Sequence, residues 1–212
     1  MGPAATRSER SYGGKTAAER TSERRERLVD ATIHVLADAG EGRSTMTAIC
    51  AEAGLTERYF YESFANLDEA MVAAFDHVCD EILTMAATII EGTPGTPDQR
   101  VHAVMQSFVD LVVAEPHKGK VAVAQPAANS PLRMRRNELI GVFADFVARE
   151  AEDLYGEQTW PADRARMFGV AYIAGFAELV ASWLTGDVEQ TPAELVETAS
   201  DLFTALFRRT VA

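Results

Sequence analysis

Two tetrapeptides of the same design constrain the fold of this chain most strongly. Thr-Pro-Asp-Gln at 96–99 and Thr-Pro-Ala-Glu at 191–194 each combine a capping threonine, a proline at the first helical position and Gln or Glu three residues after the threonine. Ser130-Pro131 repeats the beginning of this signal. No run alternates apolar and polar residues for long enough to indicate a convincing strand. The sequence therefore predicts an all-α fold.

Helix starts, terminating glycines and helical periodicity together predict nine helices. Gly54 separates the second helix from the third and suits a turn that needs a positive φ. Two short helices joined in this way predict a helix-turn-helix. We expect a disordered basic arm at 1–21, a three-helix domain at 22–66 that contains the helix-turn-helix, and a C-terminal helical bundle at 67–212. The expected helices are 22–39, 46–53, 56–63, 67–91, 97–114, 117–124, 131–155, 162–185 and 192–209.

The acidic charge of the chain is concentrated in its C-terminal part. The formal net charge is −12. Residues 1–66 hold 9 Lys/Arg and 10 Asp/Glu, a net of −1, which leaves 11 and 22, a net of −11, for residues 67–212. The first 27 residues have 7 basic and 4 acidic side chains, a net of +3. The N-terminal part can therefore meet a polyanion.

The cysteines and the apolar segments indicate where in the cell the protein is located. Cys50 and Cys79 are the two cysteines and lack a paired spacing, which fits a reducing cytoplasm. The N-terminus lacks the apolar core of a signal peptide. The most apolar stretch, 168–184, is interrupted by Glu178 and falls short of a membrane span. We therefore expect a soluble cytoplasmic protein without a membrane partner.

The residues that carry enzymatic or metal chemistry form no recognisable set. His34, His77, His102 and His117 share no ligand spacing with one another or with the cysteines. No nucleophile with its base and no phosphate-binding loop is visible. We expect no metal site, no cofactor and no enzymatic activity.

The short helix at 56–63 presents polar and aromatic side chains on several faces. Leu55 and Phe60 fit a hydrophobic staple across its start, and Phe64 follows Phe60 on the core side. A short helix that is crossed by its predecessor and exposes hydrogen-bonding groups in its first turn is how a helix-turn-helix enters the major groove. The candidates for DNA contact on this helix are Glu57, Arg58, Tyr59 and Tyr61.

The stretch STMTAICAEAGLTERYFYESFANLDEAM (44–71) resembles the DNA-binding domain of TetR-family transcriptional regulators. That family shows a Thr, a small residue, A-G-[VL]-[ST] and an aromatic-rich ending Y-x-x-F. Segments 115–139 and 175–186 resemble the C-terminal region of the same family, so the resemblance covers about 22–209. It implies that the DNA contacts include Thr45, Thr56, Arg58, Tyr59 and Tyr61.

Three positions depart from the family pattern. Leu67 stands where the family often has a lysine that contacts phosphate, so this contact does not carry over. Glu62 stands where a histidine is frequent, and Tyr59 is bulkier than the usual Thr or Ser. The size of Tyr59 predicts an altered base preference.

The resemblance also implies a small-molecule cavity in the C-terminal bundle. Apolar side chains at helical spacing are most often core, so the cavity hypothesis and the plain core interpretation both apply to them. The candidate ligand-binding residues are Met85, His102, Met105, Phe108, Phe143, Phe146, Phe168, Tyr172 and Phe176.

The last two expected helices predict a homodimer. The helix at 162–185 is apolar nearly all round, and such a helix needs burial on two sides. A two-fold interface between both helices and their copies would bury them. Each protomer of such a dimer carries one helix-turn-helix, which we call its reading head. Two reading heads related by two-fold symmetry require double-stranded DNA with a near-palindromic operator. The candidate dimerisation residues are Ile173, Ala177, Ala181, Leu184, Leu195, Ala199, Leu202 and Leu206.

The sequence thus predicts a dimeric DNA-binding regulator, a repressor that a small apolar ligand releases from its operator. Release would be a population shift toward a conformation with wrongly separated reading heads. Two alternatives remain open at this point. One is a DNA-binding or interaction protein that needs no ligand, and the other, much less favoured, is a helical-bundle enzyme.

Overall fold

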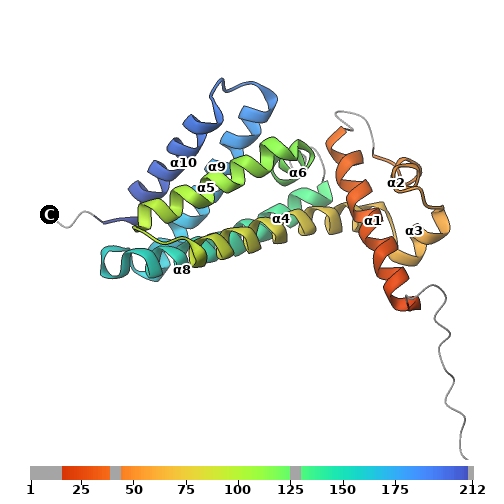
Figure 1. Cartoon of the computed structure of the whole chain (residues 1–212), viewed down its shortest axis with the longest axis horizontal. Helices are drawn as coiled ribbons and strands as arrows, with labels where there is room; N and C mark the ends of the chain where they lie inside the picture. The colour runs from red at the N-terminus through yellow and green to blue at the C-terminus, as the bar shows by residue number, and fades with distance from the viewer. Residues whose placement is uncertain (1–15, 39–43, 125–129, 210–212) are drawn as a thin grey trace, which may run out of the picture.

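The computed structural model describes residues 16–38, 44–124 and 130–209, and every regular element in these ranges is a helix. Three helices pack together at one end of the molecule, and longer helices form a bundle at the other (Figure 1). The predicted all-α fold is confirmed. The helices are α1 (Ala17–Asp38), α2 (Met46–Ala53), α3 (Glu57–Ser63), α4 (Leu67–Gly92), α5 (Pro97–Ala114), α6 (Pro116–Gly119), the π-helix η1 (Lys120–Ala124), α8 (Ser130–Tyr155), the 3₁₀ helix η2 (Gly156–Gln158), α9 (Ala162–Thr185) and α10 (Pro192–Phe207).

Local hydrogen bonds explain where several helices begin. The Thr96 hydroxyl accepts a hydrogen bond from the backbone N–H of Gln99, and the Gln99 side chain accepts one from the N–H of Thr96 at 2.8 Å. Thr191 and Glu194 make the same reciprocal pair. Each pair satisfies N–H groups that lack a partner within the helix. Both predicted capping boxes are therefore confirmed.

Two helix boundaries differ from the sequence predictions. α1 begins at Ala17, so residues 17–21 are helical although we expected them in the basic arm. Thr16 and Glu19 form a third capping box, which gives the physical reason for the early start. The remainder of the expected arm lies outside the described residues. The single helix expected at 117–124 divides into α6 and η1.

The turn between α2 and α3 depends on a glycine. Gly54 has a φ of 60°, in the left-handed region, and its N–H donates to the carbonyl of Ala51. The Leu55 N–H donates to the carbonyl of Cys50 at 2.9 Å. Phe60 is fully buried and Leu55 packs against the same core. These contacts hold α3 at a set angle to α2 as the staple predicted.

α4 belongs to two hydrophobic cores. Its first half contributes Ala70, Ala74 and Phe75 to the core that α1, α2 and α3 form. Ala86, further along the same helix, belongs to the bundle core with α5, α8, α9 and α10. The two parts of the molecule therefore share one rigid element, and a change at the bundle end of α4 can reach the three-helix end.

α9 packs against α8 and α10, and its length changes one expectation. It has 24 residues, and by length and composition alone it could cross a membrane, so the expectation that its apolar stretch falls short is wrong on that criterion. In the bundle it packs along α8 and contributes Tyr172, Phe176 and Val180 to the core. Only 17% of its apolar window is buried within the chain, so much of the surface of α9 stays accessible.

Candidate DNA-binding and ligand-binding sites

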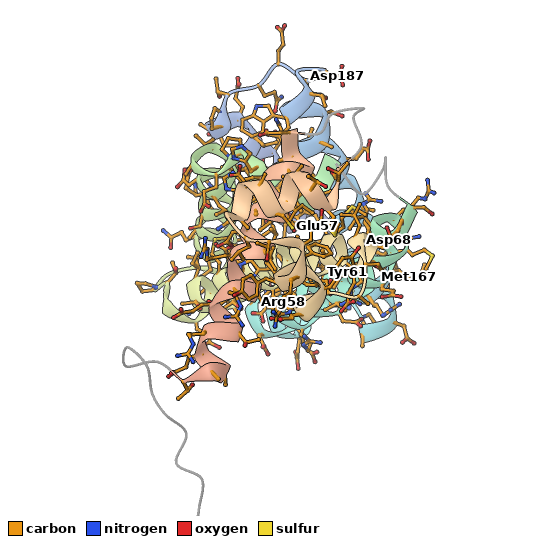
Figure 2. All side chains as sticks on the ribbon, turned by 90° about the vertical axis from the view of Figure 1, so that its right-hand side faces the viewer. Glu57, Arg58, Tyr61, Asp68, Met167 and Asp187 are labelled. Atoms are coloured by element: carbon orange, nitrogen blue, oxygen red, sulfur yellow. The ribbon has the colours of Figure 1, made fainter. Side chains whose placement is uncertain are left out.

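The three-helix end presents the polar side chains of α3 to solvent. Figure 2 shows Glu57, Arg58 and Tyr61 on the surface of this end. The Arg58 side chain is 83% exposed, and Tyr61 is 60% exposed. A buried neighbour fixes the direction of the Tyr61 ring, because Phe60 packs edge-on against it with ring centroids 5.8 Å apart. These exposed groups lie in and just after the first turn of the second helix of the helix-turn-helix, where base contacts are made.

Two threonines flank this surface, and their hydroxyls differ in what they bind. The exposed Thr45 caps α2 by accepting a hydrogen bond from the N–H of Ala48 at 3.2 Å. Thr56 precedes α3 with an extended backbone, but its hydroxyl makes no capping hydrogen bond. A threonine directly before a helix commonly caps it through the side chain. Because Thr56 does not, its exposed hydroxyl can donate to a phosphate.

Tyr59 is less accessible than the sequence suggested. It is half-buried, and the guanidinium of Arg24 from α1 lies 4.7 Å from its ring centroid. Arg24 also approaches Glu62 at 3.9 Å, and Glu62 accepts a hydrogen bond from Arg58 Nε at 3.0 Å. These four side chains form a network that couples α1 to α3. Glu62, at the position where the family often has histidine, orients Arg58.

Sequence reasoning missed the part that α1 plays at this surface. Besides Arg24, Arg25 lies over the buried Phe64 ring at 4.9 Å, and Arg27 donates to the carbonyl of Ala53 at the end of α2 at 2.6 Å. The signal was present in Ser-Glu-Arg-Arg-Glu-Arg at 22–27, which we had assigned to the start of a helix and to an overall basic charge.

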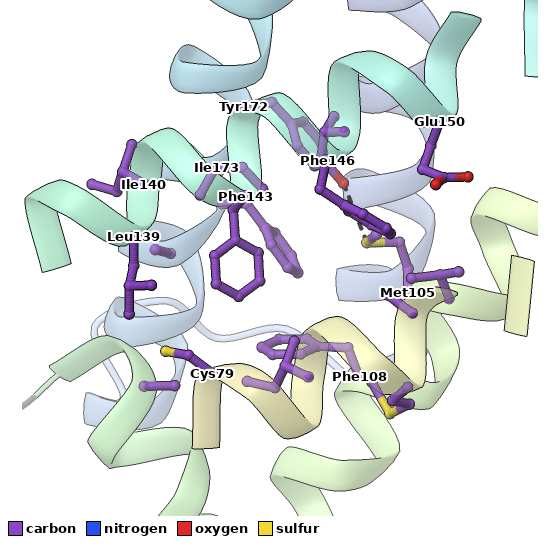
Figure 3. A pocket seen from close by; sticks show the side chains of 18 of the residues that line it. Cys79, Met105, Phe108, Leu139, Ile140, Phe143, Phe146, Glu150, Tyr172 and Ile173 are labelled. Carbon is purple, nitrogen blue, oxygen red and sulfur yellow. Dashed lines mark hydrogen bonds between the residues drawn. The ribbon is translucent and has the colours of Figure 1, made fainter. Parts of the chain in front are cut away.

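The bundle contains a partly open apolar cavity of about 140 Å³. Figure 3 shows side chains from several helices converging on it, with the rings of Phe143 and Phe108 facing each other across the space. Seven of the nine candidate ligand-binding residues line it: Met85, Met105, Phe108, Phe143, Phe146, Tyr172 and Phe176.

The other two candidates do not line the cavity. His102 is exposed on the outer face of α5. Phe168 is half-buried and packs edge-on against Trp160, with ring centroids 5.6 Å apart. Arg164 lies over both rings, 3.8 Å from the Trp160 centroid. Phe168 therefore belongs to a cluster at the start of α9 rather than to the cavity.

Sequence reasoning also missed a row of cavity residues on α8. Leu139, Ile140 and Val147 line the wall beside the two predicted phenylalanines, and Arg136 and Glu150 line it as charged residues. Their spacing of three and four residues indicates one face of a helix. That spacing was visible in the sequence, but the charged residues made the face look exposed.

Tyr172 is a polar residue in the cavity wall whose hydroxyl has partners. It donates to the carbonyl of Ala199 at 3.2 Å and also lies 3.2 Å from Met105 Sδ. Burial raises the pKa of Tyr172 well above its usual range. The hydroxyl therefore stays protonated and ties α9 to α10, which stabilises one side of the cavity.

Four candidate dimerisation residues face the interior of the chain, two of them half-buried and two fully buried. Ile173 and Ala177 line the cavity, because this face of α9 turns toward α8. Leu195 and Ala199 are fully buried, because α10 packs this stripe against α5 and α9. The other four are accessible to different degrees: Ala181, Leu184 and Leu206 are half-buried, and Leu202 is 39% exposed.

Two histidines that share no metal-ligand spacing in the sequence lie side by side in the structure. The rings of His34 in α1 and His117 in α6 stack with centroids 4.5 Å apart, and His117 Nε2 lies 3.6 Å from a carboxylate oxygen of Asp38. Within the described residues no group of three or more His, Cys, Asp or Glu side chains could hold a metal ion. We interpret the stack as a contact between the three-helix end and the bundle.

Comparison with known proteins gives matches among solved structures. A scan of the chain against protein-family models found no match, and a search of curated proteins found none either. The fatty acid degradation regulator FadR from Bacillus halodurans superimposes with a TM-score of 0.73 at 15% identity, over 88% of this chain and 97% of that one. FadR from Bacillus subtilis, solved in complex with stearoyl-CoA, gives a TM-score of 0.67 at 17% identity, over 84% and 96%.

A TetR-family transcriptional regulator from Streptomyces coelicolor gives a TM-score of 0.68 at 20% identity, over 87% of this chain and 80% of that one. At these identities the likeness concerns the fold. It extends over the three-helix end and the bundle together, since each alignment covers more than four-fifths of the chain. The chain has the fold of TetR-type transcriptional regulators.

Proposed function

We propose that this chain is a sequence-specific DNA-binding transcriptional regulator rather than an enzyme. The observation that carries the proposal is the exposed first turn of α3, where Arg58 projects from a helix-turn-helix and is oriented by Glu62. An arginine in this place can make a bidentate contact with a guanine in the major groove. Such a regulator works in the cytoplasm as a dimer on a near-palindromic operator.

The apolar cavity supports control by a small ligand. Phe75 and Cys79 from α4 line the cavity, and both also belong to the core of the three-helix end. A ligand that displaces these side chains would change how α4 meets α1. We propose that the ligand favours a conformation in which the two reading heads of the dimer no longer fit the operator, so that a repressor is released.

One structural relative was solved with a ligand whose long apolar part would suit an apolar cavity such as this one. FadR from Bacillus subtilis was solved with stearoyl-CoA, which combines a long apolar chain with a charged head. For the present chain we propose a small ligand whose main part is apolar, because aliphatic and aromatic side chains dominate the cavity wall.

The test of DNA recognition is selection of binding sites from a random pool of double-stranded DNA. The intact protein should enrich one near-palindromic sequence. Arg58→Ala should weaken binding to it by about 1–3 kcal/mol, or roughly 5–150-fold, and relax preference at one position in each half-site. Arg149→Ala, an exposed arginine on α8, is the matched control and should select the same sequence as the intact protein. Failure of the intact protein to enrich any sequence would contradict the proposed function.

A further inference from the structure

The two charged side chains that line the cavity within the described residues both come from α8. They are Arg136 and Glu150, and the rest of the wall is nearly all aliphatic, aromatic or sulfur-containing. Their positions differ by 14 (150 − 136), which is about 21 Å along a helix and close to four full turns. Both side chains therefore lie on the same face of α8 as Phe143. A charge of each sign borders the cavity, one toward each end of this face.

Arg136 has no anionic partner in the part of the chain that the structure describes. Its neighbour Arg135 donates hydrogen bonds to Asp76 and Glu138, each at 2.7 Å, and these bonds raise the pKa of Arg135. No carboxylate of the described residues lies within ion-pair distance of Arg136, which is half-buried. Because an unpaired charge beside an apolar wall is unfavourable, an anion at this place would stabilise the complex.

The opposite end of the same face has a different charge environment. Burial and the nearby carboxylate of Asp153 raise the pKa of Glu150, with a further contribution from Glu91 and a partial offset by Arg149. Carboxylates that already disfavour one another's ionisation would repel a further anion. An anionic group on a ligand is therefore favoured beside Arg136 and disfavoured beside Glu150.

We propose that the cavity binds an amphiphile with a single anionic head, held by Arg136, and an apolar body that extends along α8 past Phe143 toward Phe146. The inference deepens the proposed ligand-controlled regulator and rests on it. A guanidinium binds carboxylate and phosphate oxygens in the same bidentate manner. The head can thus be a free carboxylate or the phosphates of an acyl thioester of coenzyme A.

Calorimetric titration with three matched probes tests the head group. Dodecanoate, dodecanol and dodecanoyl-coenzyme A share an apolar chain and are used below the concentrations at which they form micelles. The intact protein should bind dodecanoate or dodecanoyl-coenzyme A about tenfold or more tightly than dodecanol. Whichever anionic probe binds more tightly identifies the source of the head. In Arg136→Gln, the ratio of the affinity for this anionic probe to the affinity for dodecanol should fall toward one. Arg136→Lys should retain part of the preference for the anionic probe.

Arg133→Gln is the matched control, because Arg133 is an exposed arginine one turn away on α8 that does not line the cavity, and this variant should keep the intact ratio. Equal affinity of the intact protein for all three probes, no binding of any of them, or an unchanged ratio in Arg136→Gln overturns the inference. Where Arg136→Gln does not fold by thermal melting, the ratio in the intact protein and in Arg136→Lys decides. Operator binding is measured separately, and its absence would count against the regulator and not against the head-group site.

Discussion

Cys79 is one of the residues at which the three-helix end and the bundle cavity meet. It lines the cavity and belongs to the core shared with α1. Burial, followed by the nearby carboxylates of Asp76 and Asp80, raises the pKa of the Cys79 thiol to about 12, although Arg135 acts in the opposite direction. The neutral thiol is thus strongly favoured, and Cys79 behaves as a small apolar side chain.

Alkylation with iodoacetamide should show this protection directly. At about pH 8 a thiol with a pKa near 12 is ionised in roughly one molecule in ten thousand, whereas an unfolded cysteine is ionised to about a quarter. We expect Cys79 in the native protein to react roughly 1,000-fold more slowly than in denaturant, measured by mass spectrometry of the peptides. Cys50, whose pKa is also raised by burial, provides a comparison within the same sample. Equal rates for Cys79 in native and denatured protein would contradict the buried placement.

At the scale of single helices, the crossing of α8 and α9 depends on a glycine. A Cβ atom at Gly169 would lie 2.6 Å from the carbonyl oxygen and 3.0 Å from the Cα of Ala144. Both are backbone atoms, which cannot move without displacing the helix. The close approach of the two helices, which carry most of the aromatic wall of the cavity, therefore requires that this position have no side chain.

Gly169→Ala should accordingly destabilise the protein by about 1–3 kcal/mol, because the helices must move apart to relieve the clash. Gly141→Ala in α8 is the control, since the nearest atom to its new Cβ would be a side-chain nitrogen of Arg166 at an ordinary 3.7 Å. There the loss of backbone freedom in the unfolded chain should stabilise the helix by about 0.5–1 kcal/mol. Denaturant titration of both variants measures the two effects. Stabilisation by Gly169→Ala would show that the crossing is looser than the structure indicates.

The elements that the sequence predicted well are those with local signals. The capping boxes at Thr96 and Thr191 and the turn at Gly54 depend on residues a few positions apart, so helix starts and the helix-turn-helix could be found without tertiary information. The same signal at Thr16 was overlooked, and α1 consequently begins earlier than expected. The direction in which a side chain faces was harder to predict. The run Ser-Glu-Arg-Arg-Glu-Arg at 22–27 indicated a basic stretch of α1, but the contact of Arg24 with Tyr59 of α3 depends on how the two helices cross.

The faces of α9 and α10 show more clearly that the sequence does not determine the direction in which each side chain points. A helix that is apolar nearly all round carries no polar face to mark solvent, so Ile173 and Ala177 could not be assigned to cavity or interface from the sequence. The cavity itself was expected from the family resemblance, and the aromatic residues at helical spacing supplied candidates for its wall. Its charged lining residues, Arg136 and Glu150, could not be predicted, because a charge on a helix face ordinarily indicates exposure to solvent.

At the scale of the whole molecule, α4 belongs to both hydrophobic cores and would therefore carry a ligand-induced change from the cavity to the three-helix end. Phe75 is nearly fully buried and contacts both the cavity and the core of the three-helix end. The His34–His117 stack provides a second connection between these regions, from α1 to α6. We propose that this shared helix would convert a small displacement in the bundle into a rotation of the three-helix end. In a dimer such rotations change the spacing of two heads, which the operator cannot accommodate.

The outer face of α9 is where we now expect the second copy of the chain to pack. Met167, Ala171, Ala174, Glu178 and Ala181 follow one another at alternating spacings of four and three residues, the spacing of a helix–helix seam. Met167 is 72% exposed, and the others are exposed or half-buried. Small side chains at three of these positions allow two helices to approach closely. This stripe replaces the cavity-lining residues Ile173 and Ala177 and the buried residues Leu195 and Ala199 as the centre of the proposed interface.

A charge placed in this stripe should separate the dimer. Ala174→Asp buries one carboxylate from each protomer at the interface, at a cost of about 3 kcal/mol or more, which weakens dimerisation by roughly 100-fold. Sedimentation velocity at micromolar concentration should show the intact protein as a dimer and this variant shifted toward monomer, with a parallel loss of affinity for a two-half-site operator. Val113→Glu introduces a charge at an exposed position at the end of α5, away from this stripe, and should remain dimeric. An intact protein that sediments as a monomer yet binds the full operator tightly would contradict both the interface and the need for two coupled reading heads.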